Sequence, residues 1–380
     1  MKKKIIFISG TRADFGKLKS LILNLQNHKN FKIFVFVTGM HLLKEYGMTW
    51  LELKYANVKN IIKYKNQKIN TLDDHIFANT VYGFSKCLKN IKPDLVVVHG
   101  DRIEALSTAI TSLLNNIPIA HIEGGEISGT KDEIIRHSIS KLANFHFVSN
   151  DEAINRLLQL GEYKSNIYKI GSPEIDIFRS KNLPSLIDTK KKYSINFNTY
   201  SILIYHAVTD EIKDIDKHIN IILESLAESK NNYVVIYPNN DPGSEHILNA
   251  YKKFERFDNF RFFPSMRFEN YVTLLKNAEF IIGNSSSGVR EAPAMGVKSI
   301  NLGNRQFDRS KAESIINSMI SKRSISLSIN KLKNIKVRKS YLFGSGNAAK
   351  KFQSILIRDS FWRRFKTKKF IDIDFKKKNK

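Results

Sequence analysis

The chain has 380 residues, of which 42% are hydrophobic, so it is long enough for two globular domains of ordinary size. No run approaches the ~20 consecutive apolar residues of a membrane-spanning helix, and a single cysteine, Cys87, excludes an intrachain disulfide and a thiolate metal site. The formal net charge is +26, and residues 331–380 contribute +14 of it, from 17 Lys or Arg and 3 Asp.

The first residues predict a strand followed by a helix with two cations near its start. Within the strand predicted at 4–9 only residues 5–8 are apolar, and the charged Arg12 and Asp14 follow too soon for a secretion signal. Residues 10–26 then read as a turn and a helix. Because a helix dipole opposes cations at its N-terminus, Arg12 and Lys17 indicate a bound anion such as a diphosphate, with scattered surface charge as the alternative.

Short apolar segments alternate with helical ones as far as about residue 170. We expect strands at 4–9, 31–37, 95–98, 117–122, 145–148 and 167–170, and helices at about 10–26, 71–90, 102–114, from 132 onward and at 151–160. This β-α alternation is the signature of a doubly wound parallel sheet, here with five or six strands.

Two of these strands end in a histidine, a glycine and a carboxylate. Strand 95–98 leads into Asp101, strand 117–122 leads into Glu123, and a polar loop after them ends at Asp132. Ligands bind at the carboxyl ends of strands in an open parallel sheet. We therefore expect Asp101, Glu123 and Asp132 to converge on one crevice as acid and base groups. For Asp101 alone, a cap on the following helix is the alternative.

A polar stretch at 172–200 predicts the join to a second domain with the same alternation. We expect its strands at 201–205, 233–237, 261–263, 280–282 and 298–302, and helices at about 214–229, 268–277, 289–295 and 348–357. No element is predicted within 311–345. The fold class is therefore α/β, with two Rossmann-like doubly wound domains that face a cleft.

Small residues follow the predicted strand 280–282. In the run from Gly283 to Gly288, Ser285 and Ser286 would let the backbone approach a phosphate at a helix N-terminus. A plain Ser/Gly turn is the alternative. Glu291 in the following helix suits a ribose diol, or it is an ordinary exposed glutamate. His206 ends strand 201–205, where neutral imidazole or imidazolium would bind a phosphate oxygen.

We expect neither a metal site nor nucleic-acid binding. His99, His121 and His137 are better explained as buried, hydrogen-bonded histidines than as ligands with a matched geometry. The basic C-terminal segment lacks an RNA-binding motif with interleaved aromatic residues. We therefore interpret it as solvated charge, with nucleic-acid or membrane-surface attachment as the alternative.

Together these motifs resemble the UDP-N-acetylglucosamine 2-epimerase family, and within it the hydrolysing members that make N-acetylmannosamine for sialic acid synthesis. The resemblance covers nearly the whole chain. Its segments are Gly10-Thr-Arg-Ala-Asp-Phe-Gly-Lys17, His99-Gly-Asp-Arg102, His121-Ile-Glu-Gly-Gly-Glu-Ile-Ser-Gly129, Arg136-His-Ser-Ile-Ser-Lys141, Tyr237-Pro-Asn-Asn-Asp241 and Gly283-Asn-Ser-Ser286 with Arg290-Glu-Ala-Pro293. Asp132 precedes Glu133 as in the hydrolysing branch, whereas non-hydrolysing relatives have paired glutamates there.

The resemblance implies a glycosyltransferase B-like architecture with the nucleotide in the interdomain cleft. We expect an N-terminal domain at 1–175, a C-terminal UDP-binding domain at 176–345, and a helix and basic tail at 346–380 that pack back on the N-terminal domain. The implied catalytic residues are Asp101, Glu123 and Asp132. The implied diphosphate ligands are Arg12, Lys17, His206, Ser285 and Ser286, with Glu291 on the ribose and Tyr271 near the uracil.

The implied reaction converts UDP-N-acetylglucosamine and water into N-acetylmannosamine and UDP. A carboxylate removes the proton of carbon 2 while UDP leaves carbon 1, and water then adds to the resulting 2-acetamidoglucal. We expect no cofactor, a cytoplasmic location, and a homo-oligomer, either a dimer or a tetramer. The alternatives are the same chemistry on UDP-2,4-diacetamido-2,4,6-trideoxyglucose for legionaminic acid, a glycosyltransferase of the same fold, and a basic nucleic-acid-binding protein.

Overall fold

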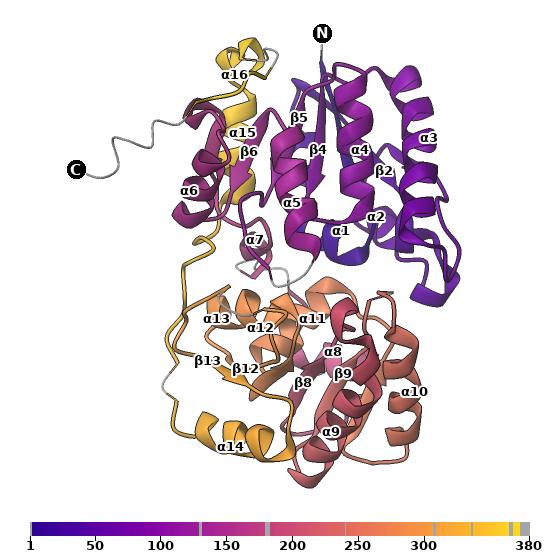
Figure 1. The fold of residues 1–380 in the computed structure, drawn as a ribbon, viewed down its shortest axis with the longest axis vertical. Helices are drawn as coiled ribbons and strands as arrows, with labels where there is room; N and C mark the ends of the chain where they lie inside the picture. Colours follow the sequence, from indigo (N-terminus) through magenta and orange to yellow (C-terminus); the bar gives the residue numbers. More distant parts are fainter. Residues whose placement is uncertain are drawn as a thin grey trace, which may run out of the picture. The chain divides into compact units, whose positions relative to one another are not determined.

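A computed structural model describes residues 2–128, 131–178, 183–239, 241–306, 309–335, 337–364 and 368–372 (Figure 1). Gly129 and Asn240 of the motifs, and residues 365–367 and 373–380 of the basic tail, lie outside the described residues. The chain forms two compact units. The first comprises Met1–Ile127, Lys131–Ile177 and Phe343–Lys380, and the second comprises Ser128–Thr130 and Phe178–Leu342.

The first unit is built on a seven-stranded parallel sheet in the order β3-β2-β1-β4-β5-β6-β7. Its strands are β1 Lys3–Ser9, β2 Phe31–Val37, β3 Ile61–Lys63, β4 Leu95–His99, β5 Ile119–Ile122, β6 Phe145–Val148 and β7 Ile167–Lys169. The prediction of five or six strands was wrong by the edge strand β3. Its three residues, two partly buried and one exposed, are too few to show an alternating pattern.

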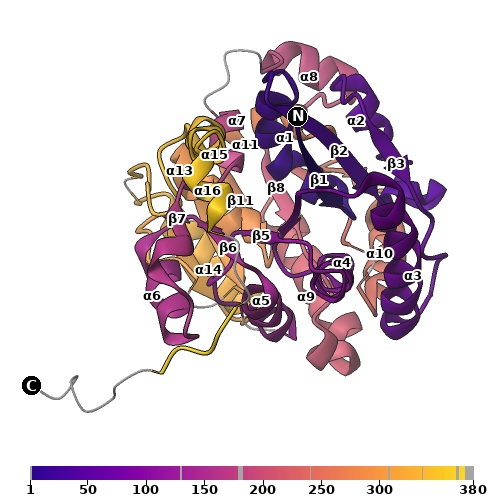
Figure 2. The ribbon, with the colours of Figure 1, turned by 90° about the horizontal axis from the view of Figure 1, so that it is seen from above.

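Helices cover both faces of this sheet (Figure 2). One face packs against α1 (Arg12–Gln26), α15 (Ala348–Leu356) and α16 (Asp359–Arg363), and the other against α3 (Asp73–Ile91), α4 (Ile103–Leu114) and α5 (Lys131–Leu142). Successive side chains of a strand point to opposite faces, so Ile5 and Phe7 of β1 join the first core and Ile6 and Ile8 the second. The remaining helices are α2 (Leu51–Tyr55), α6 (Asp151–Gln159) and α7 (Glu174–Phe178), with 3₁₀ turns at Gly39–Leu42, Lys44–Tyr46 and Lys164–Asn166.

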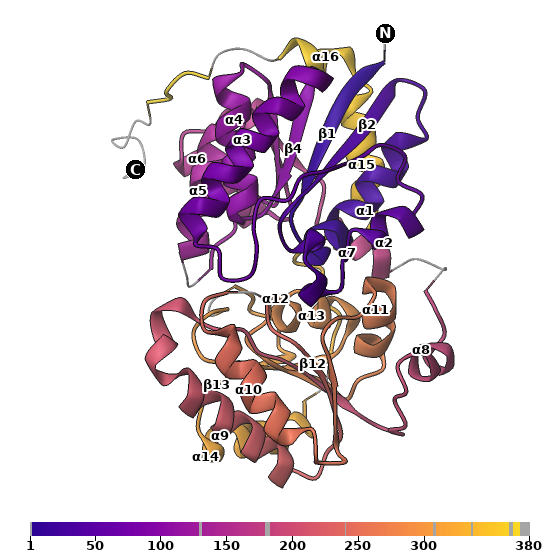
Figure 3. The ribbon, with the colours of Figure 1, turned by 90° about the vertical axis from the view of Figure 1, so that its right-hand side faces the viewer.

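The second unit has a six-stranded parallel sheet in the order β10-β9-β8-β11-β12-β13. Its strands are β8 Ser201–Ile204, β9 Tyr233–Ile236, β10 Phe260–Phe263, β11 Phe280–Gly283, β12 Lys298–Leu302 and β13 Ile315–Ser318. Its helices are α8 (Leu186–Lys192), α9 (Ile215–Glu228), α10 (Ser244–Phe254), α11 (Phe268–Lys276), α12 (Ser286–Val289), α13 (Glu291–Met295) and α14 (Lys322–Leu332), with a 3₁₀ turn at Thr209–Asp214. Helices α9, α10 and α14 lie together on one face (Figure 3).

The sequence expectations for the second unit missed the helices α8 and α10 and were wrong at two further places. The single helix predicted at 289–295 is two short helices, α12 and α13, which meet at Arg290. The segment 311–345, where no element was predicted, contains β13 and α14.

The predicted fold class is confirmed, because both units are doubly wound parallel sheets. Leaving aside the edge strand β7, each follows the strand order 3-2-1-4-5-6. The order reverses between β1 and β4 in the first unit and between β8 and β11 in the second. In such sheets, ligands bind outside the carboxyl ends of the strands at this reversal. Across the described part of the chain, no helix is both long and apolar enough to span a bilayer.

Candidate active site

At the reversal point of the first unit, the loop after β1 leads into a capped helix. Thr11 is the N-cap of α1, and its hydroxyl accepts a hydrogen bond from the Asp14 backbone N–H at 3.2 Å. The Asp14 carboxylate in turn accepts from the backbone N–H and the hydroxyl of Thr11, both at 3.0 Å. Asp14 therefore places a negative charge at the positive end of the helix dipole. Asp14 can therefore offset the positive charge of Arg12 at this helix end, and a bound anion is not required for that purpose.

His99, the last residue of β4, lies between two carboxylates. Its Nδ1 is 3.3 Å from Asp14 Oδ1 and its Nε2 is 3.1 Å from Glu123 Oε2. A carboxylate accepts hydrogen bonds, so both ring nitrogens must donate and the ring is an imidazolium. Burial opposes this charge, but the hydrogen bonds to Asp14 and Glu123 outweigh burial and raise the pKa of His99. Burial also works against ionised Asp14, yet His99, Arg102 and Thr11 lower the pKa of Asp14 to about 2.

Glu123 follows β5 and is almost fully buried, with 3% of its surface exposed. Its φ of +63° lies in the left-handed region, which a non-glycine residue adopts at a cost in free energy. The carboxylate accepts from the hydroxyl of Ser172 as well as from His99. Lys17 Nζ lies 3.7 Å from Glu123 and 3.3 Å from Glu174. Carboxylates of the chain itself thus surround Lys17, so its presence does not require a diphosphate.

Asp101 and Asp132 are linked through α5. The guanidinium of Arg136, buried to 2% exposure, pairs with Asp101 through Nη2 and donates from Nη1 to the Glu126 carbonyl at 3.0 Å. Asp132 lies four residues before Arg136, so both side chains project from the same side of the helix. The alternative that Asp101 caps the following helix was wrong. Helix α4 begins at Ile103, and its N-cap residue is Arg102.

His121 ties the loop after β4 to α5. Its Nε2 lies 2.8 Å from the Gly100 carbonyl and its Nδ1 lies 3.0 Å from Ser140 Oγ. Burial lowers the pKa of His121 to about 3, so this ring is neutral at physiological pH. The prediction of buried, hydrogen-bonded histidines is confirmed for His99 and His121. It was wrong for His137, which is only half-buried on α5 with Nε2 at 3.8 Å from Glu133.

The structure therefore brings the predicted carboxylates into two clusters at the carboxyl edge of one sheet. Glu123 joins His99, Asp14 and Lys17, and Asp101 joins Arg136 near Asp132. Their convergence on one sugar ring stays a prediction. Within the described residues, no group of three or more His, Cys, Asp or Glu side chains has the arrangement of a metal site.

In the second unit, His206 follows β8 at the reversal point and is fixed from both sides. Its backbone N–H donates to Asn284 Oδ1 at 2.7 Å, and Asn284 Nδ2 donates to the His206 carbonyl at 2.9 Å. The backbone N–H of Asn239 donates to His206 Nδ1 at 3.1 Å. Because Nδ1 accepts, the ring is the neutral tautomer with its proton on Nε2. The structure thereby decides between the two forms that the sequence left open.

The loop after β11 holds the two predicted serines. Ser285 is the N-cap of α12 and accepts from the Ser287 backbone N–H at 3.3 Å, and Ser286 is the first helical residue. The hydroxyl of Tyr271 in α11 forms a hydrogen bond with Ser287 Oγ, so Tyr271 lies beside this loop. Because α12 has only four residues, its dipole is weaker than that of the longer helix predicted here.

Glu291 is the first residue of α13 and is 4% exposed. The alternative that it is an ordinary exposed helix glutamate was therefore wrong. A buried carboxylate requires polar partners, and its place one short helix after Ser285 is compatible with a ligand hydroxyl.

Several residues of the site were not predicted as functional. Asp14, His99 and Arg136 belong to motifs that were recognised in the sequence. Their hydrogen-bond partners were not predicted. Ser172 and Glu174 come from the segment after β7, where no local pattern indicates that they reach Glu123 and Lys17.

The charge state of His99 predicts a distinctive pH dependence. The folded-state pKa is raised, so the stabilisation from His99 is complete below pH 6.5 and is lost as the pH rises through that raised pKa. His99→Gln should therefore melt about 10 °C below the parent at pH 5, as expected for breaking a buried ion pair. The difference in melting temperature between His99→Gln and the parent, measured by scanning calorimetry, should become smaller above pH 6.5.

His41→Gln is the matched control, because His41 is a buried histidine with the opposite shift. It lies 2.9 Å from Ser9 Oγ and 2.8 Å from Thr49 Oγ1, and burial lowers its pKa to about 4. Its stabilisation is complete above pH 6.5 and falls as the pH drops toward 4. The gap for His41→Gln should widen with rising pH. If the difference in melting temperature from the parent changed with pH in the same direction for both variants, that result would contradict the imidazolium assignment of His99.

The chain is similar in sequence to proteins of known name. A family model described as UDP-N-acetylglucosamine 2-epimerase matches residues 23–357. A UDP-N-acetylglucosamine 2-epimerase of Neisseria meningitidis serogroup B is 40% identical over 376 residues, 98% of this chain and 100% of that protein. A GDP/UDP-N,N'-diacetylbacillosamine 2-epimerase (hydrolyzing) of Campylobacter jejuni is 34% identical over 333 residues, 84% of this chain and 85% of that protein.

Solved structures share the fold. The structure of a UDP-GlcNAc 2-epimerase of Methanocaldococcus jannaschii, in complex with UDP-GlcNAc and UDP, superposes with a TM-score of 0.78 at 20% sequence identity. The match covers 93% of this chain and 99% of that chain. At this level of identity the likeness establishes the glycosyltransferase B-like fold of two parallel-sheet domains.

Proposed function

Because the chain belongs to the UDP-N-acetylglucosamine 2-epimerase family, we propose that it is a hydrolysing epimerase that converts UDP-N-acetylglucosamine and water into N-acetylmannosamine and UDP, for sialic acid synthesis. The proposal rests chiefly on the buried array of Asp14, His99 and Glu123 at the carboxyl edge of the sheet. The Asp101–Arg136 pair at the same edge adds a second carboxylate. A relative at 34% identity that is named as a hydrolyzing 2-epimerase supports the hydrolytic outcome.

Inversion at carbon 2 requires removal of a proton from one face of the sugar and its return on the other. We assign the two faces of the sugar to the two carboxylate clusters, with Glu123 on one face and Asp101 and Asp132 on the other. Glu123 follows β5, Asp101 follows β4 and pairs with Arg136 of α5, and Asp132 lies in α5. The proton of carbon 2 is not acidic, so positioning must lower the barrier. Holding the reacting groups in a fixed geometry can lower the activation barrier by roughly 7–11 kcal/mol. The first step expels UDP and leaves 2-acetamidoglucal, and the second adds water at carbon 1 and a proton at carbon 2.

We assign the nucleotide chiefly to the second unit. Neutral His206 would donate from Nε2 to a phosphate oxygen, with Ser285 and Ser286 as further donors. Glu291 would accept from the ribose hydroxyls, and Tyr271 would lie near the uracil. Donors aimed at the departing diphosphate stabilise the charge that develops on it.

From the first unit, we assign Arg12 to the diphosphate. Lys17 already balances Glu123 and Glu174, so we assign it a smaller share. Acid, base and electrostatic groups are sufficient for elimination and hydration, so the proposed reaction uses no cofactor.

The reaction of each UDP-sugar in heavy water tests the proposal by NMR. We expect release of UDP and a free manno sugar that has deuterium at carbon 2, because the proton is removed to solvent-exchangeable groups. Protium retained at carbon 2 would exclude elimination. UDP-N-acetylmannosamine as the product would instead indicate a non-hydrolysing enzyme. Inertness without an added acceptor would favour a glycosyltransferase, and retention on RNA with a steep salt dependence would favour a nucleic-acid-binding protein.

The second candidate substrate is UDP-2,4-diacetamido-2,4,6-trideoxyglucose. The Campylobacter jejuni relative, named for UDP-N,N'-diacetylbacillosamine, supports it. The two sugars differ at carbons 4 and 6, so the ratio of their kcat/KM values decides between them. The 40% identity to the meningococcal UDP-N-acetylglucosamine 2-epimerase leads us to prefer UDP-N-acetylglucosamine.

A further inference from the structure

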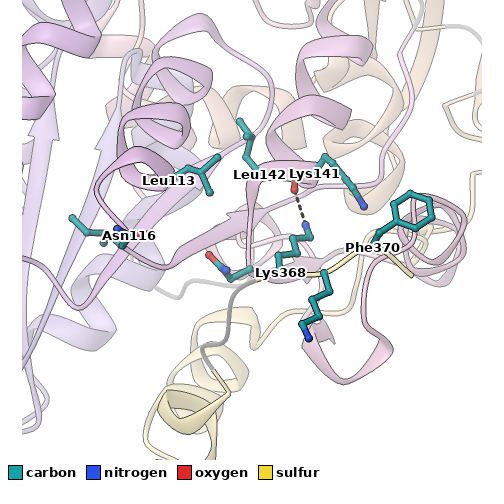
Figure 4. A pocket seen from close by; sticks show the side chains of 9 residues that line it. Leu113, Asn116, Lys141, Leu142, Lys368 and Phe370 are labelled. Atoms are coloured by element: carbon teal, nitrogen blue, oxygen red, sulfur yellow. Dashed lines mark hydrogen bonds between the residues drawn. The ribbon is translucent and has the colours of Figure 1, made fainter. Parts of the chain in front are cut away.

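The C-terminal segment of the chain packs on one face of the first unit's sheet and also contacts a helix of the other face. Asn24 of α1 donates to the Ala349 carbonyl of α15 at 3.1 Å. Beyond α15, the ring of Phe361 packs against Phe145 of β6 with centroids 4.3 Å apart. Lys368 then contacts α5, which covers the opposite face of the sheet (Figure 4).

Lys368 caps the C-terminus of α5. Its ammonium lies 3.2 Å from the Ser140 carbonyl, 2.7 Å from the Lys141 carbonyl and 2.8 Å from the Ala143 carbonyl. Carbonyls in the last turn of a helix have no partner within the helix. A cation at this end satisfies them and also complements the helix dipole.

The same ammonium balances a buried carboxylate. Glu162, 3% exposed, lies 2.5 Å from Lys368 Nζ through Oε2, 2.9 Å from His146 Nε2 and 3.4 Å from Lys141 Nζ. An ammonium has three N–H donors, so the four acceptors around Lys368 Nζ share them, with at least one N–H directed between two oxygens. Loss of Lys368 would leave Glu162 buried with its shortest ion pair missing, which is strongly unfavourable.

Helix α5 connects this cap to the candidate active site. Asp132 lies in its first turn, Arg136 in its middle pairs with Asp101, and Ser140 near its end bonds His121. A helix of 12 residues is a stiff rod about 18 Å long. A shift at its C-terminus is therefore transmitted to its N-terminal turn.

We infer that Lys368 is a positioning residue of the epimerase reaction. By capping α5 from the C-terminal segment, it fixes the helix along its axis and so places Asp132 and the Arg136-bound Asp101 against the substrate. The inference rests on the proposed function for its kinetic consequence, whereas the anchoring of α5 by Lys368 is independent of the reaction.

The surroundings of Lys368 suit a test by substitution. A cavity of about 310 Å³ lies beside it, between residues 368–370 and the C-terminal ends of α4 and α5. The cavity lies at the amino ends of β5 and β6, the sheet edge opposite the candidate site. An arginine at position 368 therefore has room to turn, and a methionine keeps the apolar stem while it removes the charge.

The experiment compares Lys368→Met with Lys368→Arg and with Lys369→Met, which changes an exposed neighbour. For Lys368→Met we expect kcat to fall on the order of 10-fold with KM within about twofold, because displacement of a positioned group costs turnover more than binding. Amides of residues 131–142 should exchange hydrogen faster. Lys368→Arg should restore most of kcat, and Lys369→Met should match the parent chain.

Several outcomes would overturn the inference. Unchanged kcat in Lys368→Met, a change in KM alone, or an equal loss in Lys369→Met would exclude a positioning role. Unchanged exchange in α5 would show that Lys368 does not anchor the helix. If the parent chain releases no UDP from either UDP-sugar, the proposed function fails. Hydrogen exchange then still decides whether Lys368 anchors α5.

Discussion

Glu123→Gln is expected to lower kcat by a factor on the order of 10²–10⁴, the usual contribution of a positioned acid or base. Glutamine keeps the shape of the side chain and can still accept from Ser172. It removes the negative charge that faces His99 and Lys17. Asp101→Asn and Asp132→Asn should show losses of the same order. The measurement is the rate of UDP release at saturating substrate.

The control for these variants is Glu133→Gln. Glu133 neighbours Asp132 on α5 but lies beside His137. Its substitution should change stability by no more than about 0.5 kcal/mol, as is usual for surface changes, and should leave kcat near that of the parent chain. A carboxylate variant that retains the full rate would remove that residue from the catalytic set. Supplying 2-acetamidoglucal directly then separates the two steps. A variant that hydrates it at the parent rate has lost only the elimination step.

Gly283→Ala is expected to destabilise the second unit by about 4 kcal/mol, from backbone strain and steric overlap together. Gly283 ends β11 with a φ of +136°, and a Cβ there would lie 1.9 Å from the Ile204 carbonyl oxygen of β8. Relief of that contact must separate two paired strands and displace Asn284, which holds His206. Melting by calorimetry and the affinity for UDP should both fall.

Gly288→Ala provides the comparison. A Cβ at Gly288 would lie 2.8 Å from Ser299 Oγ, a side-chain atom that can rotate away. We expect a much smaller loss of melting temperature for this variant. Equal stability of Gly283→Ala and the parent would contradict the close strand contact at β11.

The sequence predicted those parts of the fold that depend on local pattern. Buried runs such as β4 and β6 were recognised because they are short, apolar and followed by helices. Strand β3 and helix α14 were missed because one is very short and the other is rich in serine. The break between α12 and α13 has a sequence signal in Pro293. Pro293 is tolerated only in the first turn of a helix, which places a helix start near residue 291.

The site was predictable as far as the strand-end rule applies. That rule placed Asp101, Glu123 and His206 at the carboxyl edges of their sheets. The contact of His99 with Asp14 joins residues 85 positions apart, and the approach of Ser172 to Glu123 depends on how a loop folds. Contacts of this kind are set by tertiary packing, and no spacing in the sequence indicates them. The basic tail was visible as charge, but its capping of α5 through Lys368 was not.

The first unit is completed by a C-terminal segment that is far from the rest of the unit in sequence. The 165 residues from Phe178 to Leu342 separate its first part from Phe343 and the helices α15 and α16. During synthesis a ribosome needs roughly 10–30 s to add that many residues. For this interval, the sheet surface that Phe352 and Phe361 later cover remains open to solvent. The nascent first unit therefore exposes apolar surface until this segment has been made, and a chain truncated after residue 342 would lack the helices that cover it.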